Sequence, residues 1–270
     1  MNNKLLLLGL TAALVLGCEK NSTSDEPEDT TPKESAAEVI KDQTMHSSVM
    51  GIDVKYSIWL PPEFDKDKTY PVLYLLHGYE FDSASASKAH NGWLTSGNLN
   101  LYATAYVKDG GEPFIIVTPN GMNAFYMDGY DDRKLFYGTF FTDEFIPFIE
   151  KEYGGNGKRA IAGLSMGGFG TLYHCLLNPD KWTYAYACSP AAWGLDDLAK
   201  ECDKSKVPGI TMETGTEDIV VSLNTVTSFS SVLTENGIEH ELITRSGGHT
   251  WKFWQECLPK ILKKVGESFK

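Results

Sequence analysis

The sequence has few features that would suit a nucleic acid, an anionic membrane surface or a metal ion as a partner. Its 24 Lys and Arg residues are outnumbered by 36 Asp and Glu residues, which leaves a formal net charge of -12. A surface that binds phosphates needs clustered basic side chains, and no such cluster occurs along the chain. The five cysteines show no spacing typical of a zinc site. We therefore expect no nucleic acid partner, no metal and no cofactor.

The apolar run near the N-terminus is too short to span a bilayer as a permanent helix. Residues 5–16 are almost entirely apolar, but a dozen residues fall short of the roughly 20 that a spanning helix needs. Lys4 before the run and Gly17 after it complete the pattern of a signal peptide, predicted at residues 1–17. The sequence at 15–18, Val-Leu-Gly-Cys, resembles a bacterial lipobox, which implies that Cys18 is lipidated. The alternative is an ordinary secreted protein in which Cys18 occurs by chance.

Residues 19–42 contain almost nothing that can fill a core. Eight carboxylates stand against three lysines there, among Asn, Ser, Thr and Pro, which predicts a disordered tether over 18–44. Asp25 and Glu26 resemble the acidic export signal of Bacteroidetes surface lipoproteins. We expect an exported lipoprotein of the outer membrane or cell surface, with the periplasmic face as the alternative and with membrane contact only through the lipid. Residues 45–270 have the length of one catalytic domain.

The remaining pattern alternates strands with helices. Residues 53–60 alternate apolar and polar side chains and end at Pro61, as an outer antiparallel strand would. Short apolar runs typical of parallel strands buried on both faces follow at 71–76, 113–118, 159–163, 183–188, 210–213 and 239–244. Helical spacing occurs at 93–107, 140–153, 166–177, 222–236 and 250–269, and Pro147 should kink the second of these or mark its restart. The order predicts an α/β fold, a doubly wound and mostly parallel central sheet with helices on both faces.

Four cysteines follow the lipobox, and export makes disulfides possible. Cys175 and Cys188 lie in apolar stretches and are expected to be buried free thiols. Cys202 and Cys257 have more polar neighbours, and the sequence leaves open whether they form a disulfide. The serine-rich stretch at 83–87 is expected to be a loop.

The strongest motif is GLSMGG at 163–168, between a predicted strand and a predicted helix. This pattern resembles the nucleophile elbow of the α/β-hydrolase fold, a sharp turn that lifts a serine hydroxyl out of the sheet while its neighbours stay small, and it predicts that fold here. Gly163 and Gly167 meet that steric requirement. The turn also places Ser165 near a helix N-terminus, where the negative charge that develops during attack is stabilised. The motif therefore predicts Ser165 as the nucleophile.

A serine hydroxyl needs a base, and in this fold the chain order is Ser, acid, His. His249 fits, because it follows the predicted strand at 239–244 through Ser-Gly-Gly. His46, His77 and His90 precede the serine in the sequence. His174 is expected on the far side of the helix that follows Ser165, and His240 stands at the start of a strand, which is the wrong edge of the sheet. The orienting acid should follow the strand at 210–213, and from position alone Glu217 and Asp218 both qualify.

Two backbone N–H groups are expected to hold the oxyanion that forms on the substrate. One should belong to Met166, directly after the nucleophile. The other should come from the loop in LLHGYE at 75–80, where Gly78 allows close approach and Tyr79 supplies the N–H.

Five motifs occur in a recognisable order: LLHGYE, VTPNG at 117–121, GLSMGG, GTED at 215–218 and GGHTWKFW at 247–254. With them the chain resembles the esterase D and feruloyl esterase group, which includes carbohydrate esterase family 1, over about residues 48–268. The resemblance implies a triad of Ser165, Asp218 and His249, and so favours Asp218 over Glu217. The group includes feruloyl and acetylxylan esterases, siderophore esterases, mycolyltransferases and the cytosolic S-formylglutathione hydrolases. For an exported member we expect a feruloyl or acetyl esterase that acts on xylan-type plant polysaccharide.

Six residues are candidates for binding an acyl group or a sugar, because they belong to the expected cleft or can stack on a ring: His77, Gly78, Tyr126, Asp128, Trp193 and Trp251. The segment FYMDGY at 125–130 resembles one that lines the acyl pocket in relatives. The expected partner is an acylated polysaccharide, an oligosaccharide or another small ester. The alternatives are a siderophore or other small-ester esterase, an acyltransferase with the same acyl-enzyme, and a non-catalytic glycan-binding lipoprotein.

Overall fold

The computed structural model describes residues 36–270 of the chain. Eight strands in this part form one sheet in the order β1-β2-β4-β3-β5-β6-β7-β8. β2 (Ile52–Leu60) pairs antiparallel with β1 (Glu38–Ser47) and with β4 (Ile115–Pro119). The other strands pair in parallel: β3 (Tyr70–Leu76), β5 (Gly155–Leu164), β6 (Tyr184–Cys188), β7 (Gly209–Gly215) and β8 (Glu241–Arg245). The predicted mostly parallel sheet is confirmed.

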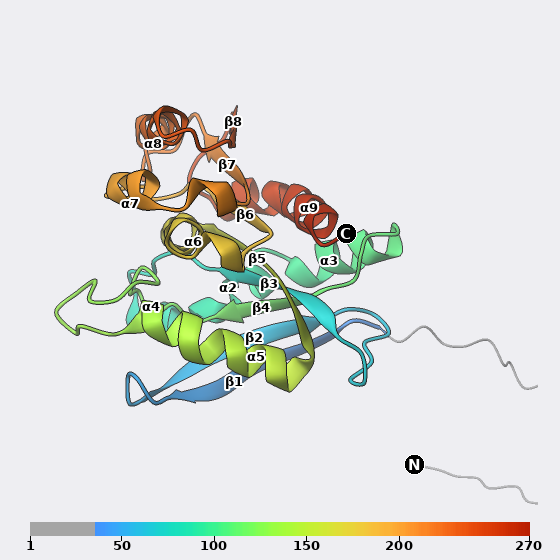
Figure 1. The fold of residues 1–270 in the computed structure, drawn as a ribbon. Coiled ribbons are helices and arrows are strands. Elements are labelled where there is room, and N and C mark those ends of the chain that lie inside the picture. The colour runs from blue at the N-terminus through green and yellow to red at the C-terminus, as the bar shows by residue number, and fades with distance from the viewer. Residues whose placement is uncertain (1–35) are drawn as a thin grey trace, which may run out of the picture. The chain divides into compact units, whose positions relative to one another are not determined.

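Helices cover both faces of the sheet, as the alternating pattern predicted (Figure 1). On one face lie α5 (Ile146–Tyr153), α6 (Met166–Leu177), α7 (Asp196–Glu201) and α8 (Leu223–Glu235), whose apolar side chains share one buried cluster with the strands. On the other face lie α2 (Gly92–Thr95), α3 (Leu99–Lys108) and α9 (Trp251–Ser268), which share a second cluster. Strands buried on both sides explain the continuous apolar runs; all seven residues of β3 are buried.

Two expectations for the first part of the domain are wrong. The predicted tether reached residue 44, whereas β1 begins at Glu38, because main-chain hydrogen bonds to β2 hold a strand that contributes few apolar side chains. The strand predicted as the outermost, now β2, has neighbours on both sides, and β1 forms the edge instead. The signal peptide at 1–17, Cys18 and the acidic pair Asp25 and Glu26 lie outside the described residues.

Three helical segments also differ from their predictions. The helix predicted at 93–107 is divided between α2 and α3, because Asn98 adopts a left-handed conformation with φ 54°. The helix predicted at 140–153 starts earlier with α4 (Tyr137–Thr139), continues as the π-helical turn η2 (Phe140–Phe145) and restarts as α5, whose first turn contains Pro147. The predicted loop at 83–87 contains the short helix α1 (Ser83–Ala86), which Asp82 caps by accepting from the N–H of Ser85.

The structure confirms the expectation for two cysteines and answers the question left open for the other two. Cys175 and Cys188 are buried free thiols, as predicted. A disulfide between Cys202 and Cys257 is not formed, because the two lie on opposite faces of the sheet: Cys202 packs against the cluster beside α6, and Cys257 belongs to the cluster beneath α9. Cys257 is fully buried although its neighbours in the sequence are polar.

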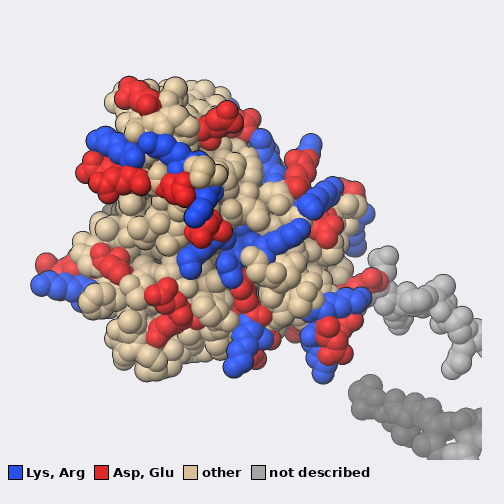
Figure 2. All heavy atoms as spheres, in the orientation of Figure 1, with Lys and Arg blue, Asp and Glu red and all other residues tan. Residues whose placement is uncertain are grey.

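Charges of both signs are mixed over the surface. Figure 2 shows Lys and Arg side chains interspersed with Asp and Glu on the face that carries α5, α6 and α7. Some of them pair locally, such as Lys200 with Asp197 at 3.1 Å. No helix within residues 36–270 has the length and apolar character needed to cross a membrane.

Candidate active site

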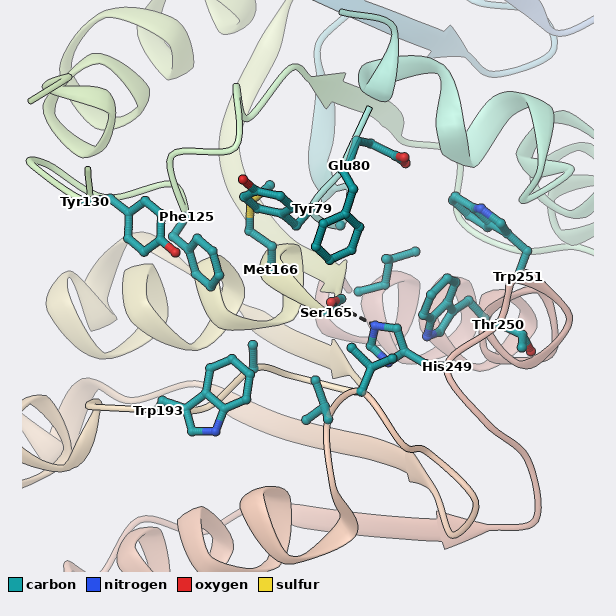
Figure 3. A pocket seen from close by; sticks show the side chains of 17 residues that line it. Tyr79, Glu80, Phe125, Tyr130, Ser165, Met166, Trp193, His249, Thr250 and Trp251 are labelled. Carbon is teal, nitrogen blue, oxygen red and sulfur yellow. Dashed lines mark hydrogen bonds between the residues drawn. The ribbon is translucent and has the colours of Figure 1, made fainter. Parts of the chain in front are cut away.

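Three polar side chains meet at the carboxyl edge of the sheet. Ser165 stands between β5 and α6, Asp218 lies in the loop after β7, and His249 lies in the loop between β8 and α9. Parallel strands bring their carboxyl ends to one edge, so residues far apart in the sequence become neighbours. Figure 3 shows the His249 ring directed at the Ser165 hydroxyl.

The turn at Ser165 has the strained geometry of a nucleophile elbow. Ser165 has φ 53° and ψ -115°, a conformation that residues with a side chain rarely adopt. Its N–H donates to the carbonyl of Cys188 at 2.9 Å, which holds the strained residue in place. A Cβ added to Gly163 would lie 2.4 Å from the carbonyl oxygen of Gly167, and one added to Gly167 would lie 2.5 Å from that of Leu76. Both glycines are therefore required by the close approach of strand and helix.

A chain of hydrogen bonds joins the three side chains. The Ser165 hydroxyl lies 2.9 Å from Nε2 of His249, and Nδ1 of the same ring lies 2.7 Å from Oδ2 of Asp218. Because an ionised carboxylate only accepts, Nδ1 carries the proton and Nε2 is left to accept from the serine. The His249 ring also packs edge-on against Trp254, with ring centroids 4.9 Å apart. The ring is thus oriented to take a proton from Ser165.

The surroundings of Asp218 keep its carboxyl group ionised. Its other oxygen, Oδ1, accepts from the N–H groups of Val220 at 2.9 Å and Val221 at 2.8 Å. Burial alone would raise the pKa of Asp218, but the hydrogen bonds from His249 and from these two amides outweigh it and lower the pKa. The other candidate acid, Glu217, is exposed and accepts instead from the hydroxyl of Ser246 at 2.7 Å. Geometry therefore selects Asp218.

The two backbone N–H groups predicted to hold the oxyanion belong to residues beside Ser165. Met166 is the first residue of α6, so its N–H has no acceptor within the helix. Tyr79 follows β3, and both residues line the cavity around Ser165. Among residues 36–270, no group accepts a hydrogen bond from either N–H. Both are free to bind a substrate oxygen.

The loop that carries Tyr79 is held by a buried framework. Nδ1 of His77 donates to the carbonyl of Gly78 at 2.7 Å, and Nε2 accepts from the N–H of Gly121 at 2.7 Å. Burial lowers the pKa of His77 to about 4, so the ring stays neutral and can serve both bonds. The Tyr126 hydroxyl accepts from the N–H of His77 at 2.9 Å and lies 3.1 Å from its carbonyl oxygen.

A cavity of about 520 Å³ opens at Ser165. One wall is a row of aromatic rings, in which Phe81 and Tyr79 have centroids 5.2 Å apart, and Phe125 and Tyr130 stack at 4.3 Å. Figure 3 shows Trp193 across the cavity from Phe125 and Tyr130, and Trp251 on the side of His249. The cavity suits a flat apolar group held beside the nucleophile.

Half of the predicted substrate-binding residues line this cavity, namely Gly78, Trp193 and Trp251. His77, Tyr126 and Asp128 do not line it. His77 and Tyr126 are buried in the framework beneath the loop, and Asp128 accepts from the N–H and hydroxyl of Thr139. The residues on the walls that the sequence did not single out include Glu80, Phe81, Val220 and Val221. Their proximity to Tyr79 and Asp218 in the sequence was an available signal.

The histidines that were set aside have other partners. His174 is buried, and its Nε2 donates to the carbonyl of Tyr126 at 2.8 Å. His90 pairs with Asp42, His46 with Asp53 and His240 with Ser230. Within residues 36–270, no three His, Cys, Asp or Glu side chains gather in the manner of metal ligands.

Comparison with known proteins points to ester hydrolysis. A model of the esterase family, described as "Putative esterase", matches residues 47–265. An endo-1,4-beta-xylanase/feruloyl esterase of Xylanibacter ruminicola is 27% identical over 207 residues, 74% of this chain but only 27% of that protein. An acetyl esterase of Caldicellulosiruptor saccharolyticus is 24% identical over 73% of this chain and 84% of its own length. The solved structure of a ferulic acid esterase has a TM-score of 0.76 and 29% identity, covering 87% of this chain and 100% of that one.

Proposed function

We propose, from the premise that the chain belongs to the esterase family, that it is a serine esterase that releases feruloyl groups from plant cell-wall polysaccharide. Membership makes it a carboxylic ester hydrolase. The serine mechanism rests on one observation above all, the continuous hydrogen bonds from Ser165 through His249 to Asp218. That arrangement is what acyl transfer through a covalent intermediate requires.

In the first half of the proposed reaction, His249 takes the proton of Ser165 while Oγ attacks the ester carbonyl. The carbonyl oxygen becomes an oxyanion that accepts from the N–H groups of Met166 and Tyr79. Asp218 stabilises the imidazolium and stays ionised itself. His249 then gives its proton to the alcohol oxygen, the bond between the carbonyl carbon and the alcohol breaks, and the acyl group remains on Ser165.

In the second half, water replaces the alcohol. His249 removes a proton from the water, whose oxygen attacks the acyl carbonyl at the same oxyanion site. Collapse of the second intermediate returns the proton to Oγ of Ser165 and releases the carboxylic acid. Atoms balance, because one water supplies the hydroxyl of the acid and the hydrogen of the alcohol.

The cavity supports an aromatic acyl group over a small one. An acetyl group needs only a fraction of a space of about 520 Å³, whereas a planar cinnamoyl group can lie between the aromatic row and Trp193. The similarity to a ferulic acid esterase agrees with this choice. Acetyl ester hydrolysis is the second candidate, favoured by the similarity to the acetyl esterase over most of its length.

The location is proposed from the sequence alone. The signal peptide pattern at 1–17 and the lipobox at Cys18 support an exported, lipid-anchored protein at the outer membrane or cell surface. Such a protein would meet polysaccharide fragments outside the cytoplasm. Labelling with a radioactive fatty acid, compared between the parent and Cys18→Ser, tests this part independently of the esterase.

Arabinoxylan that carries both ferulate and acetate tests the proposed activity. We expect ferulic acid as the main acid released, identified by chromatography. Ser165→Ala should lower kcat on methyl ferulate by about 10⁴-fold or more, because no other group can form the acyl-enzyme. Release of acetate without ferulate would favour the second candidate. Equal rates for the parent and Ser165→Ala would contradict the serine mechanism.

A further inference from the structure

A second cavity adjoins the active-site cavity and shares Glu80 and Trp251 with it. It measures about 540 Å³. The rest of its lining comes mainly from polar residues of β1, α1, α2 and the 3-10 helix η1 (Ala89–Asn91), with their flanking turns: Lys41, Asp42, Ser85, Lys88, Asn91 and Ser96. We call this space the polar cavity. None of these six residues has a part in the proposed reaction.

We propose that the polar cavity binds the sugar unit that bears the acyl group, through hydrogen bonds to its hydroxyls. The inference rests on the proposed function and deepens it, because it separates an acyl side from a sugar side. The volume of the polar cavity lies within the range of about 300–1,000 Å³ typical of small-molecule sites.

The direction of the reaction decides which side is which. His249 has to protonate the departing alcohol, so the alcohol leaves beside Nε2, and the acyl group extends away from that ring. Figure 3 shows Trp251 on the His249 side of Ser165, with Phe125 and Tyr130 on the other side. The Glu80 carboxyl group also turns away from Ser165 in this view. The aromatic row therefore receives the acyl group, and the polar cavity lies where the alcohol departs.

The lining of the polar cavity has the donors and acceptors that sugar hydroxyls need. Lys41 and Lys88 are exposed, and within residues 36–270 neither ammonium group is held in an ion pair. Asp42 is held through Oδ1, which accepts from His90 and Asn91 at 2.9 Å each, so Oδ2 can accept from a ligand. Hydrogen bonds from Asn91 and His90 lower the pKa of Asp42, which keeps it an acceptor.

Trp251 forms a rigid partition between the two cavities. Its ring packs edge-on against Trp93 at 5.5 Å and Trp254 at 5.4 Å. A Cβ added to Gly92 would lie only 3.0 Å from the Trp251 ring, so the backbone beside the partition is closely fitted. An aromatic face beside planar polar groups suits the mixed apolar and polar surface of a sugar ring.

The test compares two substrates with the same acyl group. One is methyl ferulate, which does not reach the polar cavity, and the other is a feruloylated arabinoxylan oligosaccharide. In Lys41→Ala/Lys88→Ala we expect the ratio of kcat/KM for the oligosaccharide to kcat/KM for the methyl ester to fall about tenfold, from the loss of two hydrogen bonds. Both lysines are exposed, so the variant should fold.

A matched control removes the same charge elsewhere. Lys263 and Lys270 are exposed and line a separate cavity between α3 and α9 that shares no residue with the other two. Lys263→Ala/Lys270→Ala should keep the parental ratio, which excludes an effect of net charge. If the ratio of the two kcat/KM values is the same in the parent and in Lys41→Ala/Lys88→Ala, the polar cavity does not bind the sugar unit through these lysines, and the inference is wrong. A parent that hydrolyses neither ester would instead overturn the proposed function itself.

Discussion

Glu213 of β7 and Asp218 of the loop that follows β7 are both buried carboxylates, yet their hydrogen-bond partners differ. Glu213 lies in β7, is fully buried and accepts from Arg245, Tyr186 and Lys260, the last at 2.6 Å. Asp218 is 6% exposed and accepts from His249 and two backbone amides. Hydrogen bonds outweigh burial in both cases and lower both pKa values.

The difference lies in what each partner can do. Arg245 and Lys260 are cationic side chains that take no part in the proposed reaction, and their pairs with Glu213 tie β7, β8 and α9 together. In the proposed reaction His249 takes and returns a proton, so its bond to Asp218 can support catalysis. A buried carboxylate is therefore functional or structural according to whether its partner can change charge, and burial alone does not distinguish the two.

The largest expected effect is on turnover at Asp218. Asp218→Asn should lower kcat on methyl ferulate by about 10⁴-fold. If the amide oxygen keeps the position of Oδ1, the NH2 group faces Nδ1 of His249, where it donates instead of accepting and leaves the imidazolium without a negative partner. The thermal midpoint should change little, since the amide can still accept from the N–H groups of Val220 and Val221. Glu217→Gln is the matched control and should keep parental turnover. A large loss in Glu217→Gln with little loss in Asp218→Asn would reverse the assignment of the acid.

A smaller effect is expected at Glu213, where the substitution should change stability and leave turnover nearly unchanged. Glu213→Gln should lower the free energy of unfolding by about 3 kcal/mol, because it leaves two cations beside a neutral side chain. Turnover per folded molecule should stay within a few-fold of the parent. Glu256→Gln removes an exposed partner of Arg245 and should cost at most about 1 kcal/mol. Urea unfolding measures both, and equal losses would show that burial does not set the strength of the Arg245 pairs.

The smallest effect is a pH dependence. Glu213 has a pKa below its ordinary 4.5 in the folded protein, so its stabilisation is present above pH 4.5 and is lost as the pH falls through the lower folded-state value. The difference in the free energy of unfolding between the parent and Glu213→Gln should therefore shrink in acid. Urea unfolding at neutral pH and at several values below 4.5 measures it. A difference that grows in acid would contradict a lowered pKa.

Much of the fold followed from local patterns. Apolar runs such as 71–76 predicted buried strands because a strand covered on both faces has no polar side to show. The helices at 222–236 and 250–269 begin where Ser222 and Thr250 cap them, at positions readable in the sequence. β1 was missed because its stability comes from main-chain pairing with β2, and its composition resembles that of a polar linker.

The reactive side chains of the candidate site could be predicted from the sequence, whereas the residues that line the cavity were harder to predict. The elbow motif and chain order indicated Ser165 and His249, since the required turn and spacing leave few alternatives. His77 and Tyr126 were wrongly assigned to substrate binding, because sequence position does not tell whether a side chain faces a cavity or supports it from beneath. The contacts of His77 with Gly121 and Tyr126 join segments that are distant in the sequence.

The sequence by itself determined the α/β architecture and indicated the proposed nucleophile and base, because each depends on residue type and short-range spacing. Residue positions alone left Glu217 and Asp218 open, and the tertiary structure agrees with the family resemblance in favouring Asp218. Only the tertiary structure separated Cys202 from Cys257 and placed the polar cavity beside Trp251. These outcomes depend on the direction of side chains from neighbouring loops and on the face of the sheet that each segment covers. Such directions follow from packing across the whole domain, which local patterns do not encode.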